Sequence, residues 1–187
     1  MRALVFAAAL LLAACRSPDP NFFTLAAVHG TPQGGAPSLV ELRRPGLAGY
    51  LDRPEIVRSA TAYQLKMASG ERWGEPFGDM ISRVLAEDLN QRLPGTSVFT
   101  STGSISVDAG ATVEIDVQRF DADPSGQVQF LAQVAVSRGR GRADATARAV
   151  RATVTPASTA TADYVAALSN ALGQAADQIA AMLRGRK

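Results

Sequence analysis

Two stretches in the second half of the chain alternate apolar and polar side chains, and this alternation strongly constrains the fold. In the first stretch Val113, Ile115 and Val117 are separated by polar residues, and the segment from Val128 to Val136 shows the same period of two. Successive side chains of a strand point to opposite faces, so each stretch is typical of a half-buried antiparallel strand. The segment Asp121 to Gly126 holds an Asp-Pro-Ser-Gly run and predicts a hairpin turn between the two strands.

Two other segments carry apolar residues at the spacing of an amphipathic helix. Pro76 suits the first turn of a helix, where its missing N–H costs nothing, and an apolar stripe then runs from Phe77 to Leu89. The following Leu93-Pro94-Gly95 ends this helix. A last helix is predicted from Thr161 to Arg184, and its apolar face comprises Tyr164, Leu168, Ala171, Leu172, Ala175, Ile179, Met182 and Leu183.

Shorter strands complete the predicted fold. Strands are expected at residues 22–27, 38–43, 56–58, 62–67, 97–100 and 149–155, with a turn at Ser69-Gly70. Two helices and roughly six to eight strands predict an α+β fold, with both helices packed on one face of a mostly antiparallel or mixed sheet. The chain length suits a single domain with one core.

The N-terminus has the pattern of a lipoprotein signal peptide. Arg2 supplies a positive charge, residues 3–12 form an apolar run, and Leu12-Ala13-Ala14-Cys15 is a lipobox. The run is about half of the roughly 20 residues that a membrane-spanning helix needs. We therefore predict a signal peptide at residues 1–14, a lipidated tether at 15–21 that begins with Cys15, and a domain at 22–187.

Cys15 is the only cysteine, so the chain can form no internal disulfide. An ordinary secretory signal followed by a free thiol is the alternative, but the one cysteine stands at the position that would be lipidated. In Gram-negative lipoproteins, which this leader resembles, an aspartate after the cysteine retains the protein at the inner membrane. Arg16 stands there instead, which predicts anchoring at the periplasmic face of the outer membrane.

Composition and motifs argue against nucleic-acid binding and catalysis. Nineteen basic and 17 acidic residues are dispersed along the chain, and Arg138, Arg140 and Arg142 are interpreted as a solvated hairpin end. The lone histidine, His29, lies in a Gly/Pro-rich loop and is predicted at the surface, so neither a metal site nor a Ser-His-Asp triad is expected. The acidic pairs Glu87-Asp88 and Asp121/Asp123 are assigned solvated or capping roles on a helix surface and in a turn. We expect no enzyme, cofactor or metal.

Two motifs are harder to explain by fold alone. Residues 50–58 read Tyr-Leu-Asp-Arg-Pro-Glu-Ile-Val-Arg, and residues 72–76 read Arg-Trp-Gly-Glu-Pro before the first helix. With the lipobox and Phe22-Phe23-Thr24-Leu25, their order and spacing resemble the ABC-type transport auxiliary lipoproteins, the PqiC-like group. This resemblance covers nearly all of the chain after the leader.

The resemblance implies a non-catalytic subunit of an envelope system that moves lipids, phospholipids being the expected cargo. Its implied partners are a periplasmic MCE-domain substrate-binding protein and, indirectly, an inner-membrane ABC transporter permease and ATPase; a homo-oligomer is left open. The alternatives are an assembly lipoprotein for another machine, such as lipopolysaccharide export or cell-wall synthase activation, and a periplasmic hydrolase. The candidate docking residues are Tyr50, Asp52, Arg53, Pro54, Arg58 and Trp73.

Each docking candidate also has a purely structural interpretation. The turn at Asp52 to Pro54 can serve only to redirect the chain, because Pro54 forces Arg53 to be extended. Trp73 can be a buried side chain that fills the core above the helix. For Arg53 the alternatives are an outward guanidinium that pairs with a partner, or an internal salt bridge to Glu55 or Glu75.

Overall fold

The computed structural model describes residues 19–61, 63–103, 107–139 and 145–184, and this part of the chain contains nine strands and two helices. Their bounds are β1 (Asn21–Phe23), β2 (Leu39–Leu42), β3 (Gly46–Leu47), β4 (Glu55–Thr61), β5 (Gln64–Trp73), α2 (Phe77–Arg92), β6 (Ser97–Thr100), β7 (Ala111–Ala122), β8 (Val128–Arg138), β9 (Thr146–Val154) and α3 (Thr161–Arg184).

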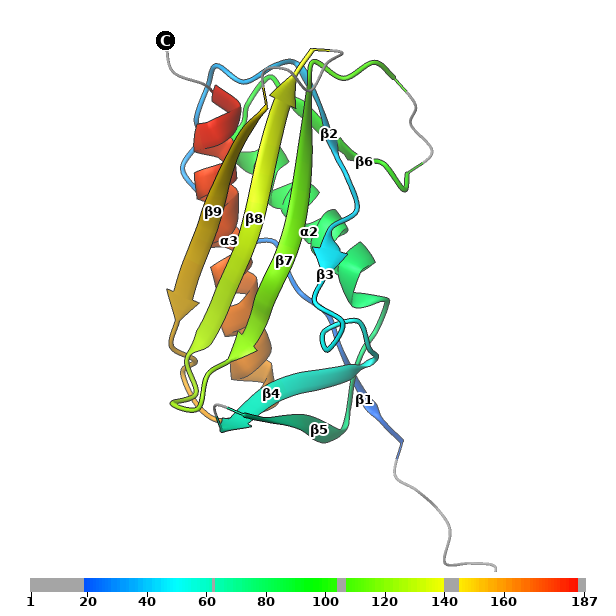
Figure 1. Cartoon of the computed structure of the whole chain (residues 1–187), viewed down its shortest axis with the longest axis vertical. Coiled ribbons are helices and arrows are strands. Elements are labelled where there is room, and N and C mark those ends of the chain that lie inside the picture. The colour runs from blue at the N-terminus through cyan, green and yellow to red at the C-terminus, as the bar shows by residue number, and fades with distance from the viewer. Residues whose placement is uncertain (1–18, 62, 104–106, 140–144, 185–187) are drawn as a thin grey trace, which may run out of the picture.

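A mixed sheet forms one layer of the domain, and both helices lie behind it on one face (Figure 1). Its order is β6-β2-β7-β8-β9, with β3 against β7. The long strands β7, β8 and β9 pair antiparallel, whereas β2 pairs in parallel with both β6 and β7. The predicted α+β fold, with two helices on one face of a mixed sheet, is confirmed.

The core lies between this sheet and the helices. Val113, Ile115 and Val117 are buried, as the period of two predicts. The predicted face of α3 is buried as well, except for Met182, which is half-buried. Aromatic rings extend the core at one end, where Trp73 stacks on Phe77 with 4.7 Å between the ring centroids. We call these stacked rings the aromatic run.

A second, smaller sheet crosses the end of the long strands at which the chain enters the domain (Figure 1). Its order is β1-β5-β4, with β4 antiparallel to β5 and β1 parallel to β5. Only residues 71–73 of β5 pair with β1, so β1 covers one end of the hairpin that β4 and β5 form.

Several predicted strands differ in the structure. The strand predicted at 22–27 ends at Phe23, because side chains of the helices take the next backbone N–H groups: Leu25 donates to Met80 Sδ, Ala26 to Ser169 Oγ and Val28 to Asp88 Oδ1. These bonds replace a strand partner.

The turn predicted at Ser69-Gly70 is wrong, since β5 continues through both residues to Trp73. Gly70 has a φ of 72°, and the pairing register of β4 and β5 shifts in this region, so the glycine marks an irregularity in the strand. The strand predicted at 149–155 begins earlier, at Thr146, and the two-residue β3 was not predicted.

Candidate functional site

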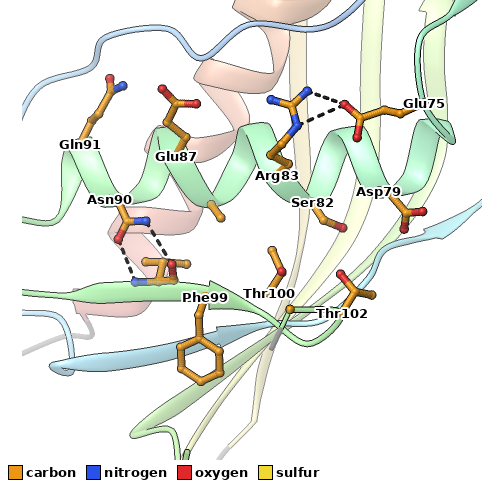
Figure 2. A pocket seen from close by; sticks show the side chains of 13 residues that line it. Glu75, Asp79, Ser82, Arg83, Glu87, Asn90, Gln91, Phe99, Thr100 and Thr102 are labelled. Atoms are coloured by element: carbon orange, nitrogen blue, oxygen red, sulfur yellow. Dashed lines mark hydrogen bonds and ion pairs between the residues drawn. The ribbon is translucent and has the colours of Figure 1, made fainter. Parts of the chain in front are cut away.

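A groove of about 820 Å³ runs between the outer side of α2 and β6 with the chain that follows it (Figure 2). Polar side chains of α2 form one wall, and among them only Glu87 was singled out from the sequence, as a solvated residue. Those labelled in the figure include Asp79, Ser82, Arg83, Glu87, Asn90 and Gln91.

Three charged residues of the groove, Glu75, Asp79 and Arg83, form ion pairs that are partly exposed to solvent. Arg83 Nη2 lies 2.5 Å from Glu75 Oε1, and Arg44 Nε lies 2.6 Å from Asp79 Oδ1 just beyond the lining. The hydrogen bond to Asp79 raises the pKa of Arg44. Solvated ion pairs of this kind are better suited to binding a polar surface of a partner than to acting as general acids or bases.

Some of the backbone hydrogen-bonding groups of the edge strand β6, beside the groove, are already bonded to other residues of the chain. The side-chain amide of Asn90 donates to the carbonyl of Val98 at 3.0 Å and accepts from the N–H of Val98 at 2.8 Å, as Figure 2 shows. The carbonyl of Thr100 accepts from the N–H of Gly103. An incoming strand would have to displace these bonds, so the groove favours side-chain recognition over strand addition.

The motif at residues 50–58 forms a surface corner held from within. Leu51 is buried, its N–H donates to Ala48, and the N–H of Arg53 donates back to the carbonyl of Leu51. The N–H of Trp73 donates to the carbonyl of Pro54 at 2.8 Å, which ties the corner to β5. Asp52 and Pro54 remain exposed.

Arg53 is half-buried at this corner, beside a hollow of about 340 Å³ that Trp73 and Glu75 also line. Among the described residues no carboxylate lies within 4.0 Å of its guanidinium, and its Nε is buried without a hydrogen-bond partner. Glu55 lies 3.9 Å from Arg72, and Glu75 pairs with Arg83. The internal salt bridge considered for Arg53 is therefore not formed within the described chain.

Arg58 and Trp73 are engaged inside the domain. Arg58 donates to the carbonyl of Thr159 and to Thr161 Oγ1, and its guanidinium lies 4.5 Å from the centre of the Tyr164 ring. Trp73 is 6% exposed within the aromatic run. These contacts give both residues a structural role, and a docking role for them stays a prediction.

Tyr50 is half-buried next to β7. Burial, with the nearby Asp121 carboxylate, raises the pKa of its phenol to about 12, so the hydroxyl stays protonated at neutral pH. The hydroxyl is hydrogen-bonded to Asp121 within the domain, and a docking role for Tyr50 stays a prediction.

Two acidic residues assigned to solvated positions are buried instead. Asp88 lies inside the helix packing and accepts from the N–H of Val28, and Asp121 lies on β7, where it accepts from Arg119 and Ser59. Asp123 has the predicted turn role, since it accepts from Ser125 and Gln127.

The remaining predicted residues have three different outcomes. His29 is exposed, as predicted. Arg138 is not a solvated hairpin end, because its guanidinium donates to the carbonyls of Met182 and Leu183 and so caps the end of α3. Leu12, Ala13, Ala14 and Cys15, with Arg140 and Arg142, lie outside the described residues.

Within the described ranges no group of three or more His, Cys, Asp or Glu residues could hold a metal ion. Nor does either described helix have the length and apolar character needed to cross a membrane.

The fold is shared with solved structures of low sequence identity. One crystal structure, of an uncharacterized protein, superposes with a TM-score of 0.74 at 16% identity, covering 88% of this chain and 99% of the other. Another, of a Xanthomonas campestris protein, gives a TM-score of 0.71 at 20% identity, covering 87% and 94%. A comparison with curated proteins finds no match.

These features define an α+β domain in which two helices pack on one face of a mixed sheet. The family model for the ABC-type transport auxiliary lipoprotein component matches residues 23–180. The chain belongs to this family, which confirms the resemblance of its motifs.

Proposed function

We propose that this protein is a non-catalytic, lipid-anchored subunit of an envelope system that moves phospholipids between the two membranes. Acyl chains on Cys15 hold it at the periplasmic face of the outer membrane, and several chains give stable anchoring where one is marginal. Its domain receives an MCE-domain periplasmic substrate-binding protein, which works with an inner-membrane ABC transporter permease and ATPase. The family match supports the transport role.

The guanidinium of Arg53 carries the docking part of the proposal. It stands on a corner that Leu51 anchors in the core and Pro54 stiffens, and no carboxylate of the described chain pairs with it. A planar guanidinium held in this way can form two parallel hydrogen bonds to a carboxylate of the partner. Asp52 and Pro54 are exposed beside it and extend the contact.

The test is one substitution measured in two ways. Arg53→Ala should weaken capture of the MCE-domain partner from crosslinked envelopes, while the free energy of unfolding changes by about 0.5 kcal/mol or less, as for a surface substitution. Arg43→Ala is the matched control, because Arg43 is an exposed arginine elsewhere whose guanidinium pairs with Glu114.

The control should keep full capture. A clear loss of stability in Arg53→Ala, with unaltered capture by the protein that remains folded, would rule out the docking role.

A further inference from the structure

Large exposed apolar side chains concentrate at one end of the domain. Five are exposed in the part of the chain that the structure describes, and four of them belong to β1, β5 and the turn between β4 and β5. These four, which we call the hairpin patch, are Phe22 (65% exposed), Tyr63 (100%), Leu65 (40%) and Met67 (41%).

The four residues of the patch lie along β5 and at its two ends. Leu65 and Met67 are alternate residues of β5 and therefore point to the same face of the strand. Tyr63 stands at the turn beyond them, and Phe22 lies beside the other end of β5, where it pairs in register with Arg72. Lys66 is exposed between Leu65 and Met67 and, by the same alternation, points to the opposite face of β5.

The hairpin is fastened firmly to the domain. The Tyr164 hydroxyl donates to the carbonyl of Val57 on β4 and accepts from the N–H of Ala122 on β7. Burial raises the pKa of that hydroxyl, so it stays a donor. Thr161 Oγ1 donates to Glu71 Oε2 on β5 at 2.6 Å. The hairpin patch therefore keeps a fixed orientation relative to the long strands and helices.

The proposed anchor enters the domain at this same end. Only six residues separate Cys15 from Phe22, and the seven Cα–Cα steps of a fully extended chain reach about 25 Å. Figure 1 shows β1 at the end that the β4–β5 hairpin crosses, whereas the last turn of α3 lies at the opposite end. A lipid on Cys15 would therefore keep the hairpin end, and not the far end, near the membrane.

We infer that the hairpin patch is a membrane-contact surface that rests in the headgroup region of the phospholipid leaflet holding the anchor. This inference depends on the proposed lipid anchor. Tyrosine places an apolar ring and a polar hydroxyl at a membrane interface, and the exposed phenylalanine, leucine and methionine side chains suit the apolar side of that interface. Two attachments, the acyl chains and the patch, fix the tilt of the domain, so that its long strands stand away from the membrane and the far end faces the periplasm.

The experiment uses the full-length, acylated protein in vesicles of phosphatidylethanolamine and phosphatidylglycerol. Tyr63→Cys introduces a single free thiol, because Cys15 is consumed by acylation, and the thiol is labelled with a polarity-sensitive fluorophore. Arg184→Cys is the control, since Arg184 is exposed at the last turn of α3. We expect blue-shifted emission at position 63, with loss of fluorescence to headgroup-labelled quencher lipids, and neither effect at position 184.

The outcomes separate the inference from the anchor on which it depends. Protein that floats with the vesicles but shows the same emission and quenching at both positions would overturn the membrane contact alone. Shielding at position 63 without lipid quenching would also overturn it, because another copy of the chain would then cover the patch. Protein that carries no acyl mass and does not float would overturn the anchor and, with it, the inference.

Discussion

Replacing Arg92 with alanine should destabilise this domain severely, because its guanidinium joins three segments from a position that is 1% exposed. Its Nη1 donates to the carbonyl of Val28 at 2.8 Å and lies 3.4 Å from Asp88 Oδ1. Its Nη2 donates to the carbonyl of Gly173 on α3, and its Nε lies 2.6 Å from Asp177 Oδ1.

The loss can be estimated from the groups that the substitution leaves behind. Removing one partner of a buried ion pair costs about 3–5 kcal/mol, and Asp88, whose side chain is 0% exposed, would keep an uncompensated charge. Each buried carbonyl left without a donor costs about 1–3 kcal/mol more. Asp177 is 46% exposed, so water replaces most of what it loses. A total of at least about 4 kcal/mol approaches the whole stability of an ordinary domain.

The assay is chemical denaturation of the wild type, Arg92→Ala and the double variant Asp88→Asn/Arg92→Ala. The double variant should be more stable than Arg92→Ala, because it removes the buried charge that the single variant leaves unpaired. A loss below about 1 kcal/mol in Arg92→Ala, or a double variant less stable than the single one, would refute this reasoning.

Three further predictions concern pH, core packing and the anchor. Burial raises the pKa of Asp88 to about 6 from an ordinary value of 3.8, so between these values the native state binds more protons than the unfolded state. Acidification through pH 6 should therefore stabilise the wild type relative to Asp88→Asn, by about 3 kcal/mol at most, in pH-dependent denaturation. Leu85→Ala and Ile179→Ala, both at 0% exposed positions, should each cost about 2–5 kcal/mol, and shifts below about 0.5 kcal/mol in both would contradict the assigned helix faces. Cys15→Ala should abolish acylation and release the domain from membranes, whereas wild-type protein recovered without acyl mass would refute the lipobox interpretation.

Local patterns predicted the regular elements well. The strand predicted at 97–100 and the helix predicted at 161–184 match β6 and α3. The first helix begins after Pro76 and ends before Leu93, as the proline and the Leu-Pro-Gly run indicate. Each of these signals is contained within a few neighbouring residues, so no distant contact was needed to interpret it.

Two of the failures have in common that a distant partner decides the outcome. The strand at β1 ends early because Met80, Ser169 and Asp88 accept the N–H groups that would continue it. Asp88 is buried because the chain folds back to Arg92 and Val28, and periodicity alone cannot show such contacts.

The candidate site was predicted in part, for the same reason. Pro54 predicts an extended residue before it, and so a guanidinium on a rigid corner. Whether Arg53 finds an internal carboxylate depends on where Glu55 and Glu75 lie, and these pair with Arg72 and Arg83. The groove along α2 was missed because its lining unites one helix with β6, and the sequence does not show that these two elements lie side by side.

The most direct test of the proposed function is to identify what the full-length protein holds in its own envelope. Tagged wild-type protein is captured after crosslinking in intact cells, and the co-purified proteins are identified by mass spectrometry. We expect an MCE-domain periplasmic protein and, through it, the permease and ATPase of an ABC transporter, with less of all three in Arg53→Ala. Capture of a lipopolysaccharide export component or a cell-wall synthase in their place, unaffected by Arg53→Ala, would contradict the proposed function.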